Sequence, residues 1–500
     1  MKKNNKLQYT LITGMGLLLS ACGGGNESST TTDGQLTAVI TDKGVTGDPT
    51  TGRTLPSITD VKAQLGMKLF FTKGLGGDQD SACVTCHHPK LGGGDDLSLP
   101  IGVGAESPDL LGPGRRHSSV KDHYDGGPTV PRNAPTTFNL ALWDQFLFHD
   151  GRIESLTKTV GTNGAGGGIR TPDSAFNTAD ADAGANLSEA QARFPVTSPE
   201  EMRGFTFEAG TGNAAARTHL ENRLQEVVSE LPKNEWLAEF RTGFNDPTGT
   251  AAALITYPNI ANAIGEYERS QIFVKNSWKA YVDGNKSAIS EDAKKGALLF
   301  YNTVAKGGAN CASCHKGDFF TDEQFHVVAM PQIGRGKGND NGTYSNDDFG
   351  RFRETGVPED KYAFRTPTLL NVEETGPWGH AGAYTSLEAV VRHHLNPQQA
   401  IENYDFNQID PTINASAMKF NTQLAMDTLK QNRTDELISP ILEDVTLSDT
   451  QVNQLVAFLK ALTDPCVKTD SCISAWVPDA SDTNPDLLRV NALDSNGLPL

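Results

Sequence analysis

The sequence predicts a mainly α-helical fold that consists of two similar halves joined by long loops. Apolar residues recur at helical spacing in four segments, residues 214–231, 251–271, 385–395 and 448–462, whereas the alternation typical of strands is scarce. Glycine provides 50 of the 500 residues, which favours long loops between helices over a compact all-β domain.

A repeated unit divides the chain into the two halves. The motif GMKLFF at residues 66–71 precedes CVTCH at 83–87, and GALLFY at 296–301 precedes CASCH at 311–315. Each copy indicates a short helix with an apolar end, then a glycine-rich loop, then the cysteine pentapeptide. Ser290 and the two acids after it predict the start of the second of these helices.

The two pentapeptides have the spacing required for covalent haem attachment. Two thiols three residues apart add to the vinyl groups of a haem, and the next histidine supplies the proximal iron ligand. A zinc site would need a second cysteine or histidine pair at short range, which neither copy has. We therefore expect two c-type haems in two cytochrome c-like domains that arose by internal duplication. The attachment residues are Cys83, Cys86 and His87 in the first copy and Cys311, Cys314 and His315 in the second.

The first residues are typical of an export signal. A lysine-rich start is followed by an apolar run over 7–21, which is too short to span a bilayer, and then by Cys22. The sequence LSAC at 19–22 resembles a bacterial lipoprotein cleavage box, so Cys22 is expected to become a lipidated N-terminus. The alternative is ordinary cleavage nearby, with Cys22 left over. We expect export to the periplasmic side of a bacterial membrane, contacted through the lipid anchor only.

The expected organisation has five parts. They are a signal peptide (1–22), a flexible tether rich in Gly, Ser and Thr (23–55), an N-terminal haem domain (56–285), a C-terminal haem domain (286–465) and a C-terminal tail (466–500). Cys466 and Cys472 follow the last predicted helix. An oxidising compartment favours a disulfide between them, with two free thiols as the alternative.

Charge and composition restrict the partners. The formal net charge is −18, which argues against nucleic acid as a partner and suits a basic soluble protein. Hydrophobic residues make up 37% of the chain, too few for a polytopic membrane protein.

Five further segments occur in order around the two pentapeptides. They are NAPTTFN at 133–139, FHDGR at 148–152, PEEM at 199–202, FRTPTLLNV at 364–372 and TGPWGH at 375–380. In this order they resemble the bacterial diheme cytochrome c peroxidase family, which includes the MauG-type enzymes. The resemblance extends from about residue 60 to residue 465, with a long insertion near 155–190.

The resemblance implies a cytochrome c peroxidase-type oxidoreductase in which the N-terminal haem is peroxidatic and the C-terminal haem supplies its electrons. Hydrogen peroxide would be reduced to water with electrons from a small external redox protein, a cytochrome c or a cupredoxin. Two alternatives stay open. One is MauG-type oxidation of residues on a partner protein, and the other is a diheme electron carrier without peroxidase activity.

The resemblance also implies that the first haem has an open face. Relatives carry a removable distal histidine in a stretch that corresponds to residues 99–104, where this chain has Val103. Because valine cannot bind iron, this haem is expected to be open to peroxide. His117 or His123 in the loop that follows could take the place of the missing ligand.

Two residues are expected to act above this open face. The family's catalytic glutamate precedes a methionine and maps to Glu201 before Met202, where it would move a proton between the two peroxide oxygens. A family glutamine ten residues upstream maps to Gln191, which would hold water or peroxide. The alternative for Glu201 is an ordinary pair of acids at a helix start.

The second haem is expected to take its sixth ligand from a helix after His380. Thr385-x-x-Glu388 predicts the helix start, and His394 ends an apolar stripe at helical spacing. His394 also occupies the place where relatives carry methionine or tyrosine. His393 and Met330 are the alternative ligands, and a buried histidine without a ligand role is the alternative for His394.

The resemblance implies an electron relay and a metal ion between the haem domains. Relatives place a relay tryptophan where this chain has His149, so either His149 replaces it or Trp143 or Trp378 takes over. Relatives also bind a calcium ion through oxygens of an Asn, a Thr and a Pro. The matching residues are Asn133, Thr375 and Pro377, which could equally form an ordinary loop turn.

Overall fold

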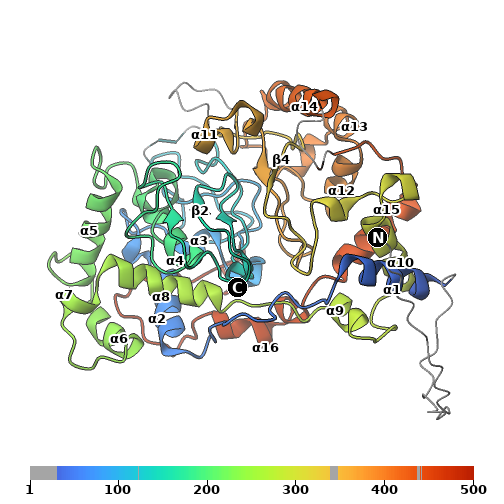
Figure 1. The fold of residues 1–500 in the computed structure, drawn as a ribbon. Coiled ribbons are helices and arrows are strands. Elements are labelled where there is room, and N and C mark those ends of the chain that lie inside the picture. Colours follow the sequence, from blue (N-terminus) through green and yellow to red (C-terminus); the bar gives the residue numbers. More distant parts are fainter. Residues whose placement is uncertain (1–30, 122, 125, 338–346, 436–439, 441) are drawn as a thin grey trace, which may run out of the picture.

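The structure is a computed structural model that describes residues 31–121, 123–124, 126–337, 347–435, 440 and 442–500. Within these residues the fold is mainly α-helical, as predicted, with few strands (Figure 1). The helices up to residue 282 are α1 (Thr32–Lys43), α2 (Val61–Phe71), α3 (Cys83–Cys86), α4 (Leu187–Gln191), α5 (Asn213–Leu224), α6 (Trp236–Gly243), α7 (Ala251–Leu254), α8 (Tyr257–Arg269) and α9 (Ser277–Val282). Those that follow are α10 (Glu291–Tyr301), α11 (Phe352–Thr355), α12 (Leu387–Leu395), α13 (Pro397–Glu402), α14 (Met418–Asp435), α15 (Asp449–Lys460) and α16 (Asp470–Ile473).

The strands form two small antiparallel sheets. The first has the order β1-β2-β3, from β1 (Phe146–Leu147), β2 (Ile153–Ser155) and β3 (Ile169–Arg170). The second pairs β4 (Phe325–His326) with β5 (Phe364–Arg365), so that His326 lies opposite Phe364. Among the described helices, none has both the length and the apolar composition needed to cross a bilayer.

The predicted repeat is visible as two equivalent helix pairs. Helix α2 packs against α8, and α10 packs against α15. A glycine lies at each crossing, because a Cβ atom on Gly66 would lie 1.9 Å from the Ala263 carbonyl oxygen, and one on Gly296 would lie 1.8 Å from that of Gln454. Both motifs therefore begin with glycine because the facing helix leaves no room for a side chain.

Each helix pair belongs to its own hydrophobic core. The first core contains Phe70, Trp236 and Tyr267, and the second contains Phe300 and Phe458. Figure 1 shows the two groups of helices as the left and right halves of the molecule. The second half begins earlier than the predicted residue 286, because Trp278 and Tyr281 of α9 lie in its core.

The described part of the expected tether, residues 31–55, is not free. Thr31 caps α1 by accepting a hydrogen bond from the Gly34 amide, and α1 lies beside α10 (Figure 1). Asp33 accepts a hydrogen bond from the Tyr281 hydroxyl at 2.8 Å and pairs with Lys294 at 3.0 Å. Residues 1–30, which include the signal peptide and Cys22, lie outside the described residues.

Residues 466–500 are likewise not a free tail. They return to the first half, where the Val490 amide donates to the Phe71 carbonyl at 2.9 Å and Val490 and Ala492 enter the core. Asp486 accepts hydrogen bonds from Thr72 at 2.6 Å and from the Trp236 indole at 3.1 Å. The structure joins Cys466 to Cys472 in a disulfide with a Cα–Cα distance of 5.2 Å, the pairing expected from the sequence.

Helix ends differ from the prediction where local capping decides them. The segment 251–271 is two helices, because Thr256 caps the Asn259 amide and Pro258 starts α8 anew. The cap of α12 is Ser386, which accepts from the Ala389 amide, and not Thr385. The Ser448–Gln451 capping box of α15 is as predicted.

Candidate functional site

Both cysteine pentapeptides open into one cavity that lies between the two halves. Its walls include both thiols and the histidine of each copy, together with Glu201, Gln191 and His394. It contains about 3230 Å³ of empty space, part of it open to solvent. The four thiols Cys83, Cys86, Cys311 and Cys314 form no disulfide, so all four are available for thioether bonds.

The two pentapeptide histidines are held in the tautomer that an iron ligand needs. The Nδ1 atom of His87 lies 3.2 Å from the Gly93 carbonyl oxygen, and that of His315 lies 3.1 Å from the Phe320 carbonyl oxygen. A proton on Nδ1 leaves Nε2 as the coordinating atom. Burial lowers the pKa of each imidazole to about 4, so both are neutral. Thiols, imidazoles and cavity together fit a covalently attached haem at each copy.

The adjacent histidines of α12 have different surroundings. His394 lines the cavity, and its Nδ1 lies 2.9 Å from the Val390 carbonyl oxygen one turn earlier. Burial is the largest influence that lowers the pKa of His315, and the nearby His394 is the second. His393 faces away, because Nε2 contacts the Val328 carbonyl oxygen at 2.8 Å and Nδ1 contacts the Tyr384 hydroxyl at 2.9 Å. Both nitrogens of His393 are therefore occupied by protein groups.

Glu201 lies on η5 (Pro199–Arg203), a single π-helical turn. Its carboxyl is enclosed by protein, which raises its pKa, while the positive charges of Arg152 and Lys337 oppose that rise. Glu200 points elsewhere and accepts a hydrogen bond from the Ser198 hydroxyl at 3.2 Å. Of these two adjacent acids, Glu201 lines the cavity, and Glu200 is hydrogen-bonded to Ser198.

Gln191 ends α4 and lines the same cavity. Its Oε1 atom is buried and has no hydrogen-bond partner among the described residues. A buried amide oxygen without a partner is costly unless a ligand or water donates to it. Within the described part of the chain, Gln191 therefore carries a buried, unpaired amide oxygen at the cavity wall.

Comparison with known proteins decides the family. Residues 60–287 match the family described as di-haem cytochrome c peroxidase. The methylamine utilization protein MauG of Methylorubrum extorquens is 30% identical over 338 residues, which cover 68% of this chain and 69% of the relative. The chain belongs to the di-haem cytochrome c peroxidase family. It is therefore a peroxidase-type oxidoreductase with two c-type haems.

A further relative is similar in sequence, and two solved structures share the fold. The cytochrome c551 peroxidase of Pseudomonas aeruginosa is 24% identical over 334 residues, 67% of this chain and 71% of the relative. The diheme peroxidase BthA of Burkholderia thailandensis has the same fold, with a TM-score of 0.50 and 20% identity over 88% of this chain and 92% of that one. A MauG-like protein associated with microbial copper homeostasis has a TM-score of 0.52 and 19% identity, and the match covers 84% of this chain and 96% of that one.

In this diheme peroxidase, the stretch that relatives use for a distal histidine is part of the protein interior. Val103 is 3% exposed, and Pro100 of the same stretch lines the haem cavity. His117 lines a separate cavity, and the ring of His123 stacks on Phe205. Neither histidine belongs to the described lining of the haem cavity.

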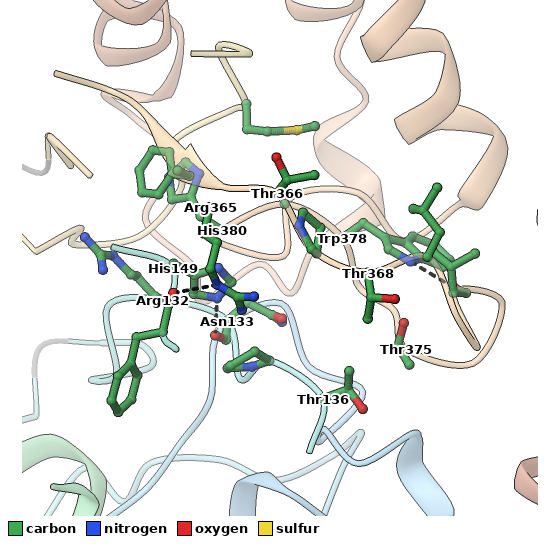
Figure 2. A pocket seen from close by; sticks show the side chains of 18 of the residues that line it. Arg132, Asn133, Thr136, His149, Arg365, Thr366, Thr368, Thr375, Trp378 and His380 are labelled. Atoms are coloured by element: carbon green, nitrogen blue, oxygen red, sulfur yellow. Dashed lines mark hydrogen bonds between the residues drawn. The ribbon is translucent and has the colours of Figure 1, made fainter. Parts of the chain in front are cut away.

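The three relay candidates of the peroxidase all line the haem cavity. His149 donates through Nε2 to the Asn133 carbonyl at 3.0 Å (Figure 2). Trp378 donates its indole N–H to the Val372 carbonyl at 3.0 Å. The Cζ atom of the Arg365 guanidinium lies 3.5 Å from the centroid of the Trp143 ring. A cation over an indole favours the neutral ring over its oxidised form, so Trp143 is the hardest of the two tryptophans to oxidise.

The three calcium candidates also lie along this cavity. The side-chain NH₂ of Asn133 donates to the carbonyls of Leu97 at 2.9 Å and Ser98 at 3.2 Å, which leaves the amide oxygen for a cation. Figure 2 shows Asn133 and Thr375 on the cavity wall. Carbonyl and amide oxygens are the donors that calcium prefers.

Lys337, Asp322 and His326 belong to no motif that could identify them, and Arg152 belongs to the FHDGR segment but was assigned no role. Lys337 and Arg152 reach the cavity beside Glu201, and the proximity of Arg152 lowers the pKa of Lys337 to about 8. The ligand atoms of Cys314, Asp322 and His326 lie within 4.8 Å of one another. Because Cys314 is an expected thioether residue, that cluster belongs to the second haem site.

Proposed function

We propose that this protein reduces hydrogen peroxide to water at the N-terminal haem, with electrons that enter at the C-terminal haem from a small external redox protein. The observation that carries the proposal is the position of Glu201 in the cavity that also contains His87. The balanced reaction consumes one peroxide, two protons and two electrons and yields two waters. The haems, when attached, bind the peroxide and supply the electrons.

The residues of the chain hold these groups and move the protons. Cys83, Cys86 and His87 would hold the first haem, and His315 with its two cysteines would hold the second. His394 would serve as the further ligand of the second haem, because its Nδ1 is tied to Val390 and its ring lines the cavity. Met330 lines the same cavity but lies on a loop, which makes it the weaker alternative.

Glu201 acts as the acid–base group. As a carboxylate it takes a proton from the peroxide oxygen that binds, and it returns that proton to the oxygen that leaves. The side-chain oxygen of Gln191 accepts a hydrogen bond from the peroxide or from a water beside it. A positioned acid–base group of this kind contributes about 10²–10⁴-fold to the rate.

Glu201→Gln tests this function, with Glu200→Gln as the matched control. We expect Glu201→Gln to lower kcat for peroxide by about 10²–10⁴-fold while both haems stay attached. Glu200→Gln should keep full turnover because Glu200 does not line the cavity. If Glu201→Gln keeps full turnover, the acid–base role is wrong. If the unmodified holoprotein consumes no peroxide, a diheme electron carrier becomes the better description.

A second candidate is MauG-type oxidation of a partner protein. Two observations favour it, the valine at position 103 and a histidine instead of methionine at position 394. Steady-state assays separate the candidates. Rapid peroxide consumption that requires a reduced cytochrome or cupredoxin supports the peroxidase, whereas slow consumption without a donor supports oxidation of a protein substrate.

Electrons pass between the haem sites by way of His149 or Trp378. Both line the common cavity, and among the described residues no cation lies over the Trp378 ring in the way that Arg365 lies over Trp143. A calcium ion held by Asn133, Thr375 and Pro377 would fix the cavity wall that carries this route.

The donor and the location follow from charge and from the N-terminus. A net charge of −18 steers a basic donor, so donor-dependent kcat/KM should fall as salt rises. With Cys22 as the lipidated terminus on the periplasmic side, eight residues lie between the anchor and Thr31, the cap of α1. At roughly 3.5 Å per residue step, the chain from Cys22 to Thr31 spans at most about 30 Å, which limits the distance between the start of α1 and the membrane.

A further inference from the structure

Arg115 is almost completely buried, with 4% of its surface exposed. Its guanidinium donates to five main-chain carbonyl oxygens, those of Ile101 at 2.7 Å, Gly102 at 2.9 Å, Ser107 at 3.2 Å, Pro108 at 3.1 Å and Leu110 at 2.8 Å. The hydrogen bonds that this charge donates within the described part of the chain all go to carbonyl groups, while Asp80, Asp95 and Asp109 lie near enough to favour its charged form. A buried guanidinium satisfied in this way fixes the backbone that accepts from it.

The backbone held by Arg115 lies directly against the Glu201 turn. The Val103 amide donates to the Glu200 carbonyl at 3.2 Å. A Cβ atom on Gly102 would lie 2.3 Å from the Glu200 carbonyl oxygen and 2.4 Å from that of Glu201. The two backbones are therefore in contact, and Gly102 is required for that contact.

The same stretch is anchored on its far side to the first attachment unit. The Gly104 amide donates to the Asp80 carboxylate at 2.8 Å, and Asp80 lies three residues before Cys83. Residues 101–104 are thus tied at three points, to Arg115, to the Glu201 turn and to the segment that leads into the first pentapeptide. None of these ties involves the second half of the molecule.

We propose that Arg115 is a positioning residue for the peroxidase reaction, which acts through residues 101–103 to hold Glu201 over the first haem site. This inference rests on the acid–base role of Glu201 and adds the residue that sets its position. A proton transfer between two oxygens depends steeply on distance, so a displacement of about 1 Å can cost about 10²-fold in rate.

The test compares Arg115→Lys and Arg115→Met with Arg116→Met in the haem-loaded protein. Arg116 is the matched control, since it is the exposed neighbour in the same loop and Arg116→Met removes the same charge. We expect kcat for peroxide to fall about 10- to 100-fold in Arg115→Met. The loss should be smaller in Arg115→Lys, which keeps the positive charge but lacks the several N–H donors of the planar guanidinium. KM, haem content and the EPR signal of the second haem should stay as in the control.

A double variant separates positioning from a merely structural role. Because Arg115 acts through Glu201, Arg115→Met should cause no further loss of turnover in the Glu201→Gln background. An additional loss of the same size in that background overturns the inference. So does an Arg115→Met enzyme with the same kcat as Arg116→Met.

Gly102→Ala keeps the test decisive if Arg115→Met does not fold. Its new methyl group would press on the carbonyls of the Glu201 turn, so we expect a loss of kcat with both haems retained. Normal kcat in Gly102→Ala contradicts the inference. If Glu201→Gln alone loses turnover while the Arg115 and Gly102 variants do not, this inference fails and the proposed function stands. Full turnover of Glu201→Gln removes the acid–base role of Glu201 and with it this inference, whereas the proposed function fails only if the unmodified holoprotein does not consume peroxide.

Discussion

His393 and His394 are neighbours on α12 but belong to different environments. His393 is fully buried, with both ring nitrogens bonded to protein groups, whereas His394 lines the haem cavity with Nδ1 bonded to the preceding turn. Of the two, only His394 lines the cavity.

His394→Ala should therefore alter the second haem specifically. Loss of the sixth ligand converts that haem from low spin to high spin, which EPR and the optical spectrum report. His393→Ala is the control: it should lower thermal stability, because Tyr384 and the Val328 carbonyl lose a buried partner, and it should leave the spectrum unchanged. An unaltered spectrum in His394→Ala would point to Met330 as the ligand.

The acidic limb of the pH profile should report Glu201. Its base form is the carboxylate, and burial raises its pKa above the usual 4.5, so kcat/KM should fall on acidification at a higher pH than an ordinary glutamate would give. Lys337 opposes that rise. Lys337→Met should therefore move the limb to higher pH, whereas the exposed Lys306→Met should not move it. An unmoved limb in Lys337→Met contradicts this electrostatic reading.

The tryptophans should differ as electron relays. Trp378→Phe should slow electron transfer between the haems in stopped-flow experiments with the half-reduced enzyme. Trp143→Phe should leave the rate nearly unchanged, because Arg365 already disfavours oxidation of that ring. If electron transfer is slower in Trp143→Phe than in Trp378→Phe, electrons pass through Trp143, and the assignment of Trp378 as a relay is wrong. His149→Phe completes the set and tests whether the histidine replaces the relay.

Calcium removal should lower turnover without releasing haem. Chelation would free Asn133, Thr375 and Pro377 to move, and added calcium should restore activity where magnesium does not, since the smaller ion tolerates such a site poorly. Asn133→Ala should make the enzyme insensitive to the chelator. Full activity after exhaustive chelation, with no calcium found by elemental analysis, would exclude the metal.

The sequence predicted those features that local chemistry determines. The pentapeptides, the short helices that precede them and the Ser448 cap all follow from short-range patterns. The packing of α1 was missed because its helix depends on partners far along the chain, Tyr281 and Lys294. The composition of residues 23–55 indicated only a flexible linker.

The hydrogen bonds of Arg115 to main-chain carbonyls could not be predicted for a similar reason. Its partners are main-chain carbonyls, which every residue has, so no residue type marks them. The choice between His393 and His394 also needed the structure, because helical spacing places them one residue apart and only their contacts separate them.

EPR of the resting ferric protein tests the central claim most directly. A first haem with an open face beside Glu201, and a second haem closed by His394, predict one high-spin and one low-spin signal in equal amounts. Addition of peroxide should abolish the high-spin signal. Two low-spin signals that do not respond to peroxide would contradict the account.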